Sequence, residues 1–258
     1  MNLDLFADDT EQVAKLVRYG RFADTPYAAR LDTDHQGVWI DVPNGALYYA
    51  PYFFVPSASD APLRQFLQFD GFEGTDILAF DWRSVANVAD LAFQNIDWQQ
   101  DRITLYGKTH NLPRLTAWYG DRDCVYRYSG LTLTPQPWTA ELDFIREQLA
   151  TVCTCRFNSV LLNWYRDGRD HMSWHADDEV ELGYHPTIAS VSFGATRRFV
   201  LRRRDDHTQK LILPLYHGSV LMMAGALQQY WQHSVPKQAA IRTSRINLTF
   251  RTIHSPFG

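Results

Sequence analysis

The residues of this chain best suited to chemistry are two histidines and an aspartate in its C-terminal half. His175-Ala-Asp177 is the only His-x-Asp sequence among nine histidines, and His233 follows downstream. Two imidazoles and one carboxylate can occupy one face of an octahedral iron(II) ion and leave its other positions open. We therefore expect His175, Asp177 and His233 to be the metal ligands of a catalytic centre. Alone, the motif is also compatible with a histidine hydrogen-bonded to a neighbouring carboxylate.

Four further polar residues lie at even spacings in apolar segments. Arg245 and Arg251 are six residues apart, and Asn163 and Tyr165 are two apart. Alternate residues of a strand share a face, so each pair would point to one side. Buried guanidiniums need anionic partners, and two of them can hold a dicarboxylate by charge-assisted hydrogen bonds. Asn163 and Tyr165 could hold the same co-substrate, or could simply bond to backbone and form a wall. The combination predicts an oxygenase that uses iron and a keto-diacid.

The segments that must position these side chains read as short strands separated by turns, preceded by one helix. The helix is expected over Thr139–Val152, with Thr139 as its cap and an apolar stripe that includes Leu142, Ile145 and Leu149. Strands are expected over residues 159–165, 187–193, 198–203, 210–215, 219–223, 233–235 and 245–252. Many short strands at this spacing predict a jelly roll. The fold class is thus α+β, predominantly β, with a double-stranded β-helix core and flanking helices.

The N-terminal half is less regular. Residues 1–30 are predicted to form a tail and a short helix over Thr10–Tyr19. Alternating apolar and polar residues around Pro43-Asn44-Gly45 predict two strands joined by a turn within 37–55. Short helices are expected over 63–69 and 84–93. No linker or repeat divides the remainder, so 31–258 is predicted to be a single catalytic domain.

Composition limits the class of protein. The chain has 258 residues, 45% of them hydrophobic, which is enough for one large domain. Its three cysteines do not make a disulfide framework, which favours a reducing compartment. No apolar run has the length of a signal peptide or a membrane span. We expect a cytoplasmic protein without a membrane partner, and a monomer by default.

The charge of the chain is unevenly distributed. The net charge is −4, yet residues 151–258 hold 13 Lys and Arg against 8 Asp and Glu, and the first 150 hold 12 against 21. A basic C-terminal half is compatible with a phosphate-binding face. The arginine cluster, defined as Arg197, Arg198 and Arg202–Arg204, could form that face. It could equally be a solvated hairpin that ends at Asp205-Asp206.

Several ordered motifs together resemble one known family, the AlkB family of iron(II)/2-oxoglutarate dioxygenases, and most closely its duplex-DNA demethylases. The resemblance covers roughly residues 46–253. The motifs that carry it are Tyr106-Gly-Lys108, Leu112-Pro-Arg114, Thr116-Ala-Trp-Tyr-Gly-Asp121, Asn163-Trp-Tyr165, His175-Ala-Asp177-Asp-Glu179, Ala189-Ser-Val-Ser-Phe-Gly194, His217-Gly-Ser-Val-Leu-Met-Met223, His233-Ser and Arg245-Ile-Asn-Leu-Thr-Phe-Arg251.

The resemblance implies a role for each of these residues. His175, Asp177 and His233 would bind iron(II), and Asn163, Tyr165, Arg245 and Arg251 would bind 2-oxoglutarate. Glu179 would read the amino group of a damaged base, with Tyr119 near that base and Arg198 on the backbone phosphates. Tyr106 stands where most relatives carry the Phe that fills the gap left by a flipped nucleotide. Residues 46–138 would form a nucleotide-recognition lobe and 139–258 the jelly-roll core.

The activity implied by the resemblance is DNA repair. Such an enzyme oxidises N-alkyl groups of the 1-methyladenine and 3-methylcytosine type on a flipped base, using iron(II), oxygen and 2-oxoglutarate, and releases formaldehyde and succinate. Two alternatives stay open, a related dioxygenase that acts on RNA or protein and a β-barrel binding module without catalysis. The N-terminal sequence Asn2-Leu3-Asp4-Leu5-Phe6 also resembles peptides that dock on the bacterial sliding clamp, with Leu5 and Phe6 as the anchors.

Overall fold

A computed structural model describes residues 11–34, 37–54, 96–105, 108–124, 126–128 and 131–254 of the chain. The helices expected over 63–69 and 84–93 lie outside these residues. Tyr106, which was predicted to contact nucleic acid, also lies outside them. So do Leu5 and Phe6, which were predicted to contact a sliding clamp.

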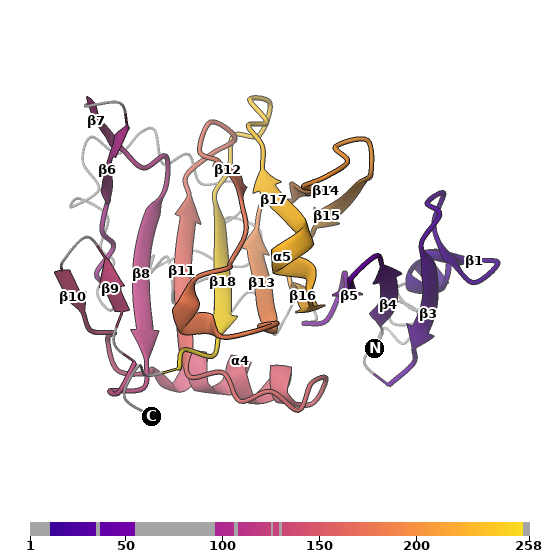
Figure 1. Cartoon of the computed structure of the whole chain (residues 1–258), viewed down its shortest axis with the longest axis horizontal. Coiled ribbons are helices and arrows are strands. Elements are labelled where there is room, and N and C mark those ends of the chain that lie inside the picture. Colours follow the sequence, from indigo (N-terminus) through magenta and orange to yellow (C-terminus); the bar gives the residue numbers. More distant parts are fainter. Residues whose placement is uncertain are drawn as a thin grey trace, which may run out of the picture.

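The largest element is a ten-stranded antiparallel sheet that runs across the molecule (Figure 1). Its strands, in spatial order, are β1 (Val17–Arg18), β2 (Arg21–Phe22), β3 (Ala28–Asp32), β4 (Gly37–Val42), β5 (Gly45–Ala50), β16 (Ser219–Gly225), β13 (Ile188–Gly194), β18 (Arg245–Arg251), β11 (Ser159–Tyr165) and β8 (Leu115–Gly120). β8 and all of β5 except Gly45 come from the range 46–138, so that range supplies two strands to the sheet that carries the core.

A four-stranded sheet lies over one face of the large sheet (Figure 1). Its strands, in order, are β12 (Met172–His175), β17 (Trp231–Val235), β14 (Arg197–Arg203) and β15 (Lys210–Leu215). Two small hairpins complete the described strands, β6 (Arg102–Leu105) with β7 (Lys108–Asn111) and β9 (Tyr126–Tyr128) with β10 (Leu131–Leu133). The two larger sheets form the predicted jelly roll, and the seven predicted strands match β11 and β13 to β18 to within two residues at each end.

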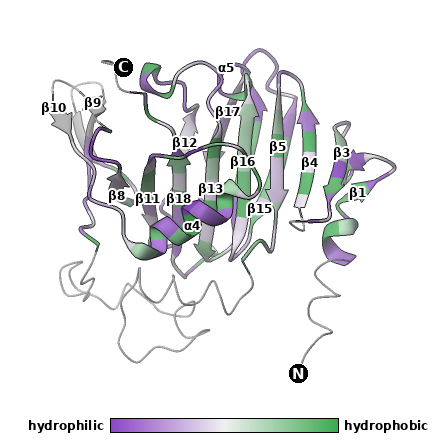
Figure 2. Cartoon of the chain, turned by 90° about the horizontal axis from the view of Figure 1, so that it is seen from below, coloured by the Kyte–Doolittle hydropathy of each residue, from purple (hydrophilic) through white to green (hydrophobic). Residues whose placement is uncertain are grey.

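The face of the large sheet turned away from the small sheet is apolar. Alternate residues of the central strands point to it, and they form one core cluster with helix α4 (Ala140–Ala150), which crosses this face (Figure 2). Thr139 caps α4 as predicted, since its side chain accepts a hydrogen bond from the Leu142 amide. The buried side of α4 is formed by Leu142, Ile145 and Leu149. None of the helices in the described segments is long and apolar enough to cross a membrane.

The opposite face of the same strands is polar, and it faces the small sheet. Because side chains alternate along a strand, each central strand contributes both to the core and to this inner face. The inner-face residues of β11, β13 and β18 are Ser159, Leu161, Asn163, Tyr165, Ser190, Ser192, Arg245, Asn247, Thr249 and Arg251. The candidate site therefore lies between the two sheets.

The helix predicted over Thr10–Tyr19 is wrong at its C-terminal end. Only residues 11–14 are helical, and Val17–Arg18 is strand β1. Tyr19 and Gly20 both have positive φ, at 51° and 73°, and they lie between the paired residues Arg18 and Arg21. Two successive residues with positive φ make a tight hairpin turn that matches the twist of the strands. The chain therefore leaves the helix before this turn, although the sequence pattern predicted a helix as far as Tyr19.

Candidate metal centre and substrate cleft

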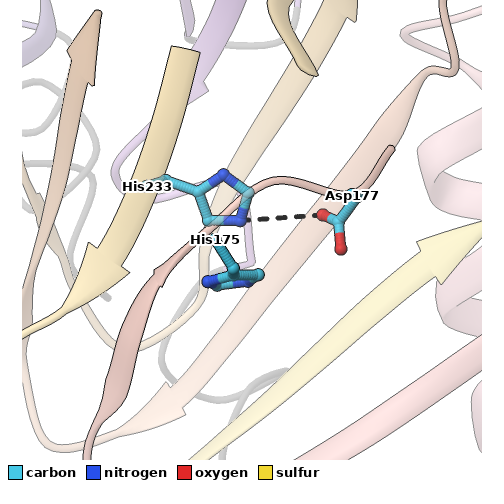
Figure 3. Close-up of side chains that lie close together, drawn as sticks. All are labelled: His175, Asp177 and His233. Carbon is cyan, nitrogen blue, oxygen red and sulfur yellow. Dashed lines mark ion pairs between the residues drawn. The ribbon is translucent and has the colours of Figure 1, made fainter. Parts of the chain in front are cut away.

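The three predicted metal ligands meet between the sheets (Figure 3). His175 ends β12 and is paired with His233 on β17, while Asp177 follows β12 by two residues. Their ligand atoms all lie within 4.8 Å of one another. The Nε2 atom of His233 is 3.6 Å from Oδ2 of Asp177, and the two imidazole centroids are 4.2 Å apart. This is the spacing of three groups that share one cation.

Both imidazoles are held so that a ring nitrogen can bind a metal. Nδ1 of His175 lies 2.8 Å from the Ser173 carbonyl oxygen. A carbonyl only accepts, so Nδ1 carries the proton and Nε2 keeps its lone pair. His233 stacks on Phe199 with a centroid distance of 5.1 Å and is 4% exposed. Burial lowers the pKa of His233 to about 3, which keeps this imidazole neutral and able to bind a metal.

Asp177 is fixed at three of its atoms. Its carboxylate Oδ1 accepts a hydrogen bond of 2.6 Å from Arg251, and its backbone amide donates to Oε1 of Gln228 at 3.0 Å. The other carboxylate oxygen, Oδ2, faces His233. Burial alone would raise the pKa of Asp177, but the charge and the hydrogen bond of Arg251 bring it below its ordinary value. The carboxylate is therefore ionised, and these donors fit a divalent cation.

A pocket lined by the predicted co-substrate residues adjoins the three ligands. Arg245, 1% exposed, forms the end of this pocket that is furthest along the inner face from Arg251. Its Nη2 donates to Ser192 at 2.9 Å and to Asn247 at 2.6 Å. Its Nε and Nη1 have no hydrogen-bond partner among the described residues. Burial lowers the pKa of Arg245 to about 10, and an anion in the pocket would satisfy both free donors.

Asn163 and Tyr165 line the same pocket, as predicted. The Tyr165 ring packs against two guanidiniums, with Arg245 at 5.2 Å and Arg197 at 5.6 Å from its centroid. The Asn163 side-chain oxygen accepts a hydrogen bond of 2.8 Å from Nε of Arg114. Sequence analysis assigned no role to Arg114. The signal that could have found it is its even spacing from Thr116 and Trp118, which puts all three on the inner face of the β8 segment.

A second, larger cavity opens on the metal ligands from the other side. It has a volume of about 430 Å³, and both His175 and Asp177 form part of its wall. Glu179 also lines it, and partial burial raises the pKa of the Glu179 carboxyl. The remaining polar wall includes Asp97, Asp101, Arg114, Trp118 and Gln136. We call this cavity the substrate cleft, because it gives a molecule of nucleotide size direct access to the metal ligands.

Tyr119 is the predicted site residue that the structure does not bring to this cleft. It is 4% exposed and belongs to the core cluster that contains Leu142 and Ile145 of α4. The neighbouring Trp118 lines the cleft instead, and its indole nitrogen donates to Ser159 at 2.7 Å. Successive residues of β8 point to opposite faces, so Trp118 faces the cleft and Tyr119 faces the core.

The arginine cluster does not form a single phosphate-binding surface. Arg197 is buried and donates to the backbone carbonyls of Asp167, Asp170 and Pro236. Arg202 stacks on Trp174, Arg203 pairs with Asp205, and Arg204 pairs with Asp178. The exception is Arg198, whose exposed guanidinium has no hydrogen bond or ion pair within the described part of the chain. Among the five arginines of this cluster, Arg198 is therefore the one whose side chain is available for a phosphate contact.

Two imidazoles, a carboxylate and a buried arginine inside a double-stranded β-helix define an iron(II) oxygenase that takes a keto-diacid as co-substrate. Comparison with known proteins agrees with this class, since the sequence model described as the 2OG-Fe(II) oxygenase superfamily matches residues 81–251. The chain belongs to this superfamily, in its AlkB branch. Its metal and co-substrate are therefore iron(II) and 2-oxoglutarate.

Individual relatives place the chain within that branch. It is 42% identical over 179 residues to the human DNA oxidative demethylase ALKBH2, covering 64% of this chain and 69% of the human protein. It is 38% identical over 207 residues to the mouse alpha-ketoglutarate-dependent dioxygenase alkB homolog 3, covering 77% and 69%. The solved structure of OsALKBH1 superimposes with a TM-score of 0.51 at 14% identity, covering 82% of this chain and 99% of that one, and supports the fold alone.

Proposed function

We propose that this protein is a DNA repair demethylase that oxidatively removes N-alkyl groups from bases of the 1-methyladenine and 3-methylcytosine type. The observation that carries the proposal is the substrate cleft, which reaches two iron ligands and is lined by Glu179. The similar proteins named DNA oxidative demethylase ALKBH2 support the choice of substrate.

The reaction would use the co-substrate pocket and the substrate cleft, which share part of their walls. His175, Asp177 and His233 would hold iron(II), which with oxygen and 2-oxoglutarate would supply the oxidising chemistry that converts the N-methyl group to hydroxymethyl and 2-oxoglutarate to succinate and carbon dioxide. Arg245 would bind the distal carboxylate of 2-oxoglutarate, beside Asn163 and Tyr165. Arg251 holds Asp177 in place. The hydroxymethyl product then breaks its C–N bond, which releases formaldehyde and returns the unmodified base.

The position of Glu179 suits recognition of a damaged base. A methyl group on N1 of adenine or N3 of cytosine blocks Watson–Crick pairing, so flipping such a base out of the helix costs less. In the substrate cleft, the Glu179 carboxylate would accept a hydrogen bond from the amino group of the base. Arg198 would meet a backbone phosphate. Tyr106 would fill the gap in the stack, within a recognition lobe that spans about 46–138.

The other expectations about partners and location also remain part of this proposal. We infer a monomer that acts in the cytoplasm, and that contacts a sliding clamp through Leu5 and Phe6. An RNA or protein substrate for the same site is an outcome of the experiment below.

The Glu179→Gln substitution tests the proposed recognition of the base. A hydrogen bond to a charged group contributes about 1.5–3 kcal/mol, so we expect kcat/KM for a 3-methylcytosine oligonucleotide to fall roughly 10- to 100-fold. Mass spectrometry of the oligonucleotide measures the loss of methyl groups. Glu181→Gln makes the same change of charge two residues further on, outside the lining of the cleft, and should leave kcat/KM unchanged.

Two results would contradict the proposal in different ways. If the unaltered protein forms succinate but demethylates neither single- nor double-stranded DNA, the substrate is RNA or protein. If DNA is demethylated equally well by the Glu179→Gln protein, then Glu179 does not read the base.

A second prediction separates the two neighbouring aromatics of β8. Stacking of a base on an aromatic side chain contributes about 1–3 kcal/mol, so Trp118→Ala should raise the KM for a methylated oligonucleotide roughly 5- to 100-fold. Tyr119→Leu also removes an aromatic ring, but it should leave the KM of the folded protein unchanged, because the Tyr119 ring packs in the core. Steady-state kinetics on both variants checks the assignment, and the reverse pattern would restore Tyr119 as the base contact.

A further inference from the structure

We propose that Gln228 and Arg204 form a clamp that positions the segment 176–179, and with it the iron ligand Asp177. Neither residue supplies a ligand atom to the metal, so both would act by positioning Asp177. The proposal rests on the iron site described above and does not depend on which substrate the enzyme demethylates.

Gln228 is the inner half of the clamp. It lies on the short helix α5 (Leu227–Tyr230), which precedes the strand of His233, and it is 1% exposed. Its side-chain oxygen accepts a hydrogen bond of 3.0 Å from the Asp177 amide, and its side-chain nitrogen donates one of 3.5 Å to the Met223 sulfur. A buried amide N–H without an acceptor costs about 1–3 kcal/mol. Without Gln228, the backbone at Asp177 would therefore move to find another partner.

Arg204 is the outer half of the clamp. It follows β14, and its Nη2 donates to the Asp178 carboxylate at 2.5 Å and to the Gln228 carbonyl at 3.1 Å. One guanidinium thus joins the backbone of α5 to the residue next to the iron ligand. Three contacts therefore hold two consecutive residues. Arg251 and Gln228 bind the carboxylate and the amide of Asp177, and Arg204 binds the carboxylate of Asp178.

The clamp is anchored to the large sheet at the turn between β4 and β5. A Cβ atom on Gly45 would lie 2.8 Å from the Ala224 carbonyl and 2.9 Å from Leu227, so only glycine allows β5 to approach α5 this closely. The indole nitrogen of Trp231, the residue after α5, donates to the Pro43 carbonyl at 2.9 Å. The turn between β4 and β5 therefore fixes α5, and α5 fixes the backbone of Asp177.

The expected effect of the clamp is on metal affinity. Loss of a group that orients a metal ligand typically lowers the affinity about 10- to 100-fold. Gln228→Met keeps nearly the same volume and removes the acceptor of the Asp177 amide. We expect it to raise the Kd for Mn²⁺ by that factor in the metal-free protein. Arg204→Gln, which breaks a more exposed pair, should raise the Kd roughly two- to fivefold.

The experiment measures Mn²⁺ affinity by titration without any nucleic acid, and records the absorption spectrum of bound Co²⁺. A change in that spectrum reports altered ligand geometry, which a merely structural role of Gln228 would not produce. The matched control is Arg146→Gln, because Arg146 forms a partly exposed pair with Asp143 on α4 and touches neither the clamped segment nor α5. Thermal unfolding of each metal-free variant confirms that it folds.

A Kd for folded Gln228→Met within twofold of the parent protein would overturn the proposal. If Gln228→Met does not fold, Arg204→Gln decides, and a Kd equal to that of Arg146→Gln overturns the proposal. Because no DNA is present, failure of the proposed demethylation would leave these measurements unaffected.

Discussion

His175→Ala is expected to abolish demethylation and to lower the affinity for Mn²⁺ more than 100-fold, since even the loss of an orienting partner costs about 10- to 100-fold. The substitution removes one of three ligand groups that lie within 4.8 Å of one another. Among the described residues, the His175 side chain hydrogen-bonds to the Ser173 carbonyl of its own strand β12, so the metal-free protein should unfold at nearly the same temperature as the parent. Mn²⁺ titration and calorimetry check both parts.

The chain offers a closely matched control for this variant. His171 lies four residues earlier and makes the same kind of bond, from Nδ1 to the Arg169 carbonyl at 3.2 Å. It does not belong to the ligand cluster. His171→Ala should therefore bind Mn²⁺ normally. Normal Mn²⁺ binding by His175→Ala would show that the metal is held elsewhere.

Arg245→Met is expected to weaken the binding of 2-oxoglutarate with little change in the affinity for Mn²⁺. Truncating one partner of a buried charge pair costs about 2–5 kcal/mol, which corresponds to a roughly 30- to 3,000-fold rise in Kd. The stability of the ligand-free protein, in contrast, should not fall. Without an anion, the guanidinium is buried while its Nε and Nη1 have no hydrogen-bond partner among the described residues, so its removal relieves a desolvation penalty. The free energy of unfolding of the ligand-free protein should be no lower than that of the parent.

Calorimetric titration with 2-oxoglutarate and denaturant unfolding test the two parts of this prediction. Arg242→Met is the control, because Arg242 is an exposed arginine three residues earlier that does not line the pocket. Unchanged 2-oxoglutarate affinity in Arg245→Met would require another partner for the distal carboxylate. A marked loss of stability without ligand would mean that the bonds of Arg245 to Ser192 and Asn247 outweigh its desolvation.

The parts of the site that the sequence predicted correctly are those where strand periodicity is regular. Asn163 and Tyr165 share the inner face of β11, and Arg245 and Arg251 share the inner face of β18, because each pair has an even spacing. The helix α4 was equally predictable from its cap and its buried stripe. In these elements, local propensity and tertiary packing point to the same structure.

The parts that the sequence did not predict depend on which face of a strand meets the cleft, or on contacts between distant segments. Trp118 and Tyr119 are both aromatic, and composition does not show which of them faces inward. Gln228 lies in a helix of four residues, too short to show a periodic pattern. Its bond to Asp177 joins residues 51 positions apart, and only the packing of α5 against the segment after β12 creates it.

The central strands carry the active site on one face and the α4-covered core on the other, and this sharing restricts how the chain can change. In β11 and β18, Asn163 is paired with Asn247, and Leu162 with Leu248. A slip of one residue would exchange the faces of every side chain in the strand. Insertion of a single residue into either strand would therefore bury polar groups under α4 and bring apolar ones to the iron ligands. Catalysis and folding must consequently be lost together when the register of these strands is altered.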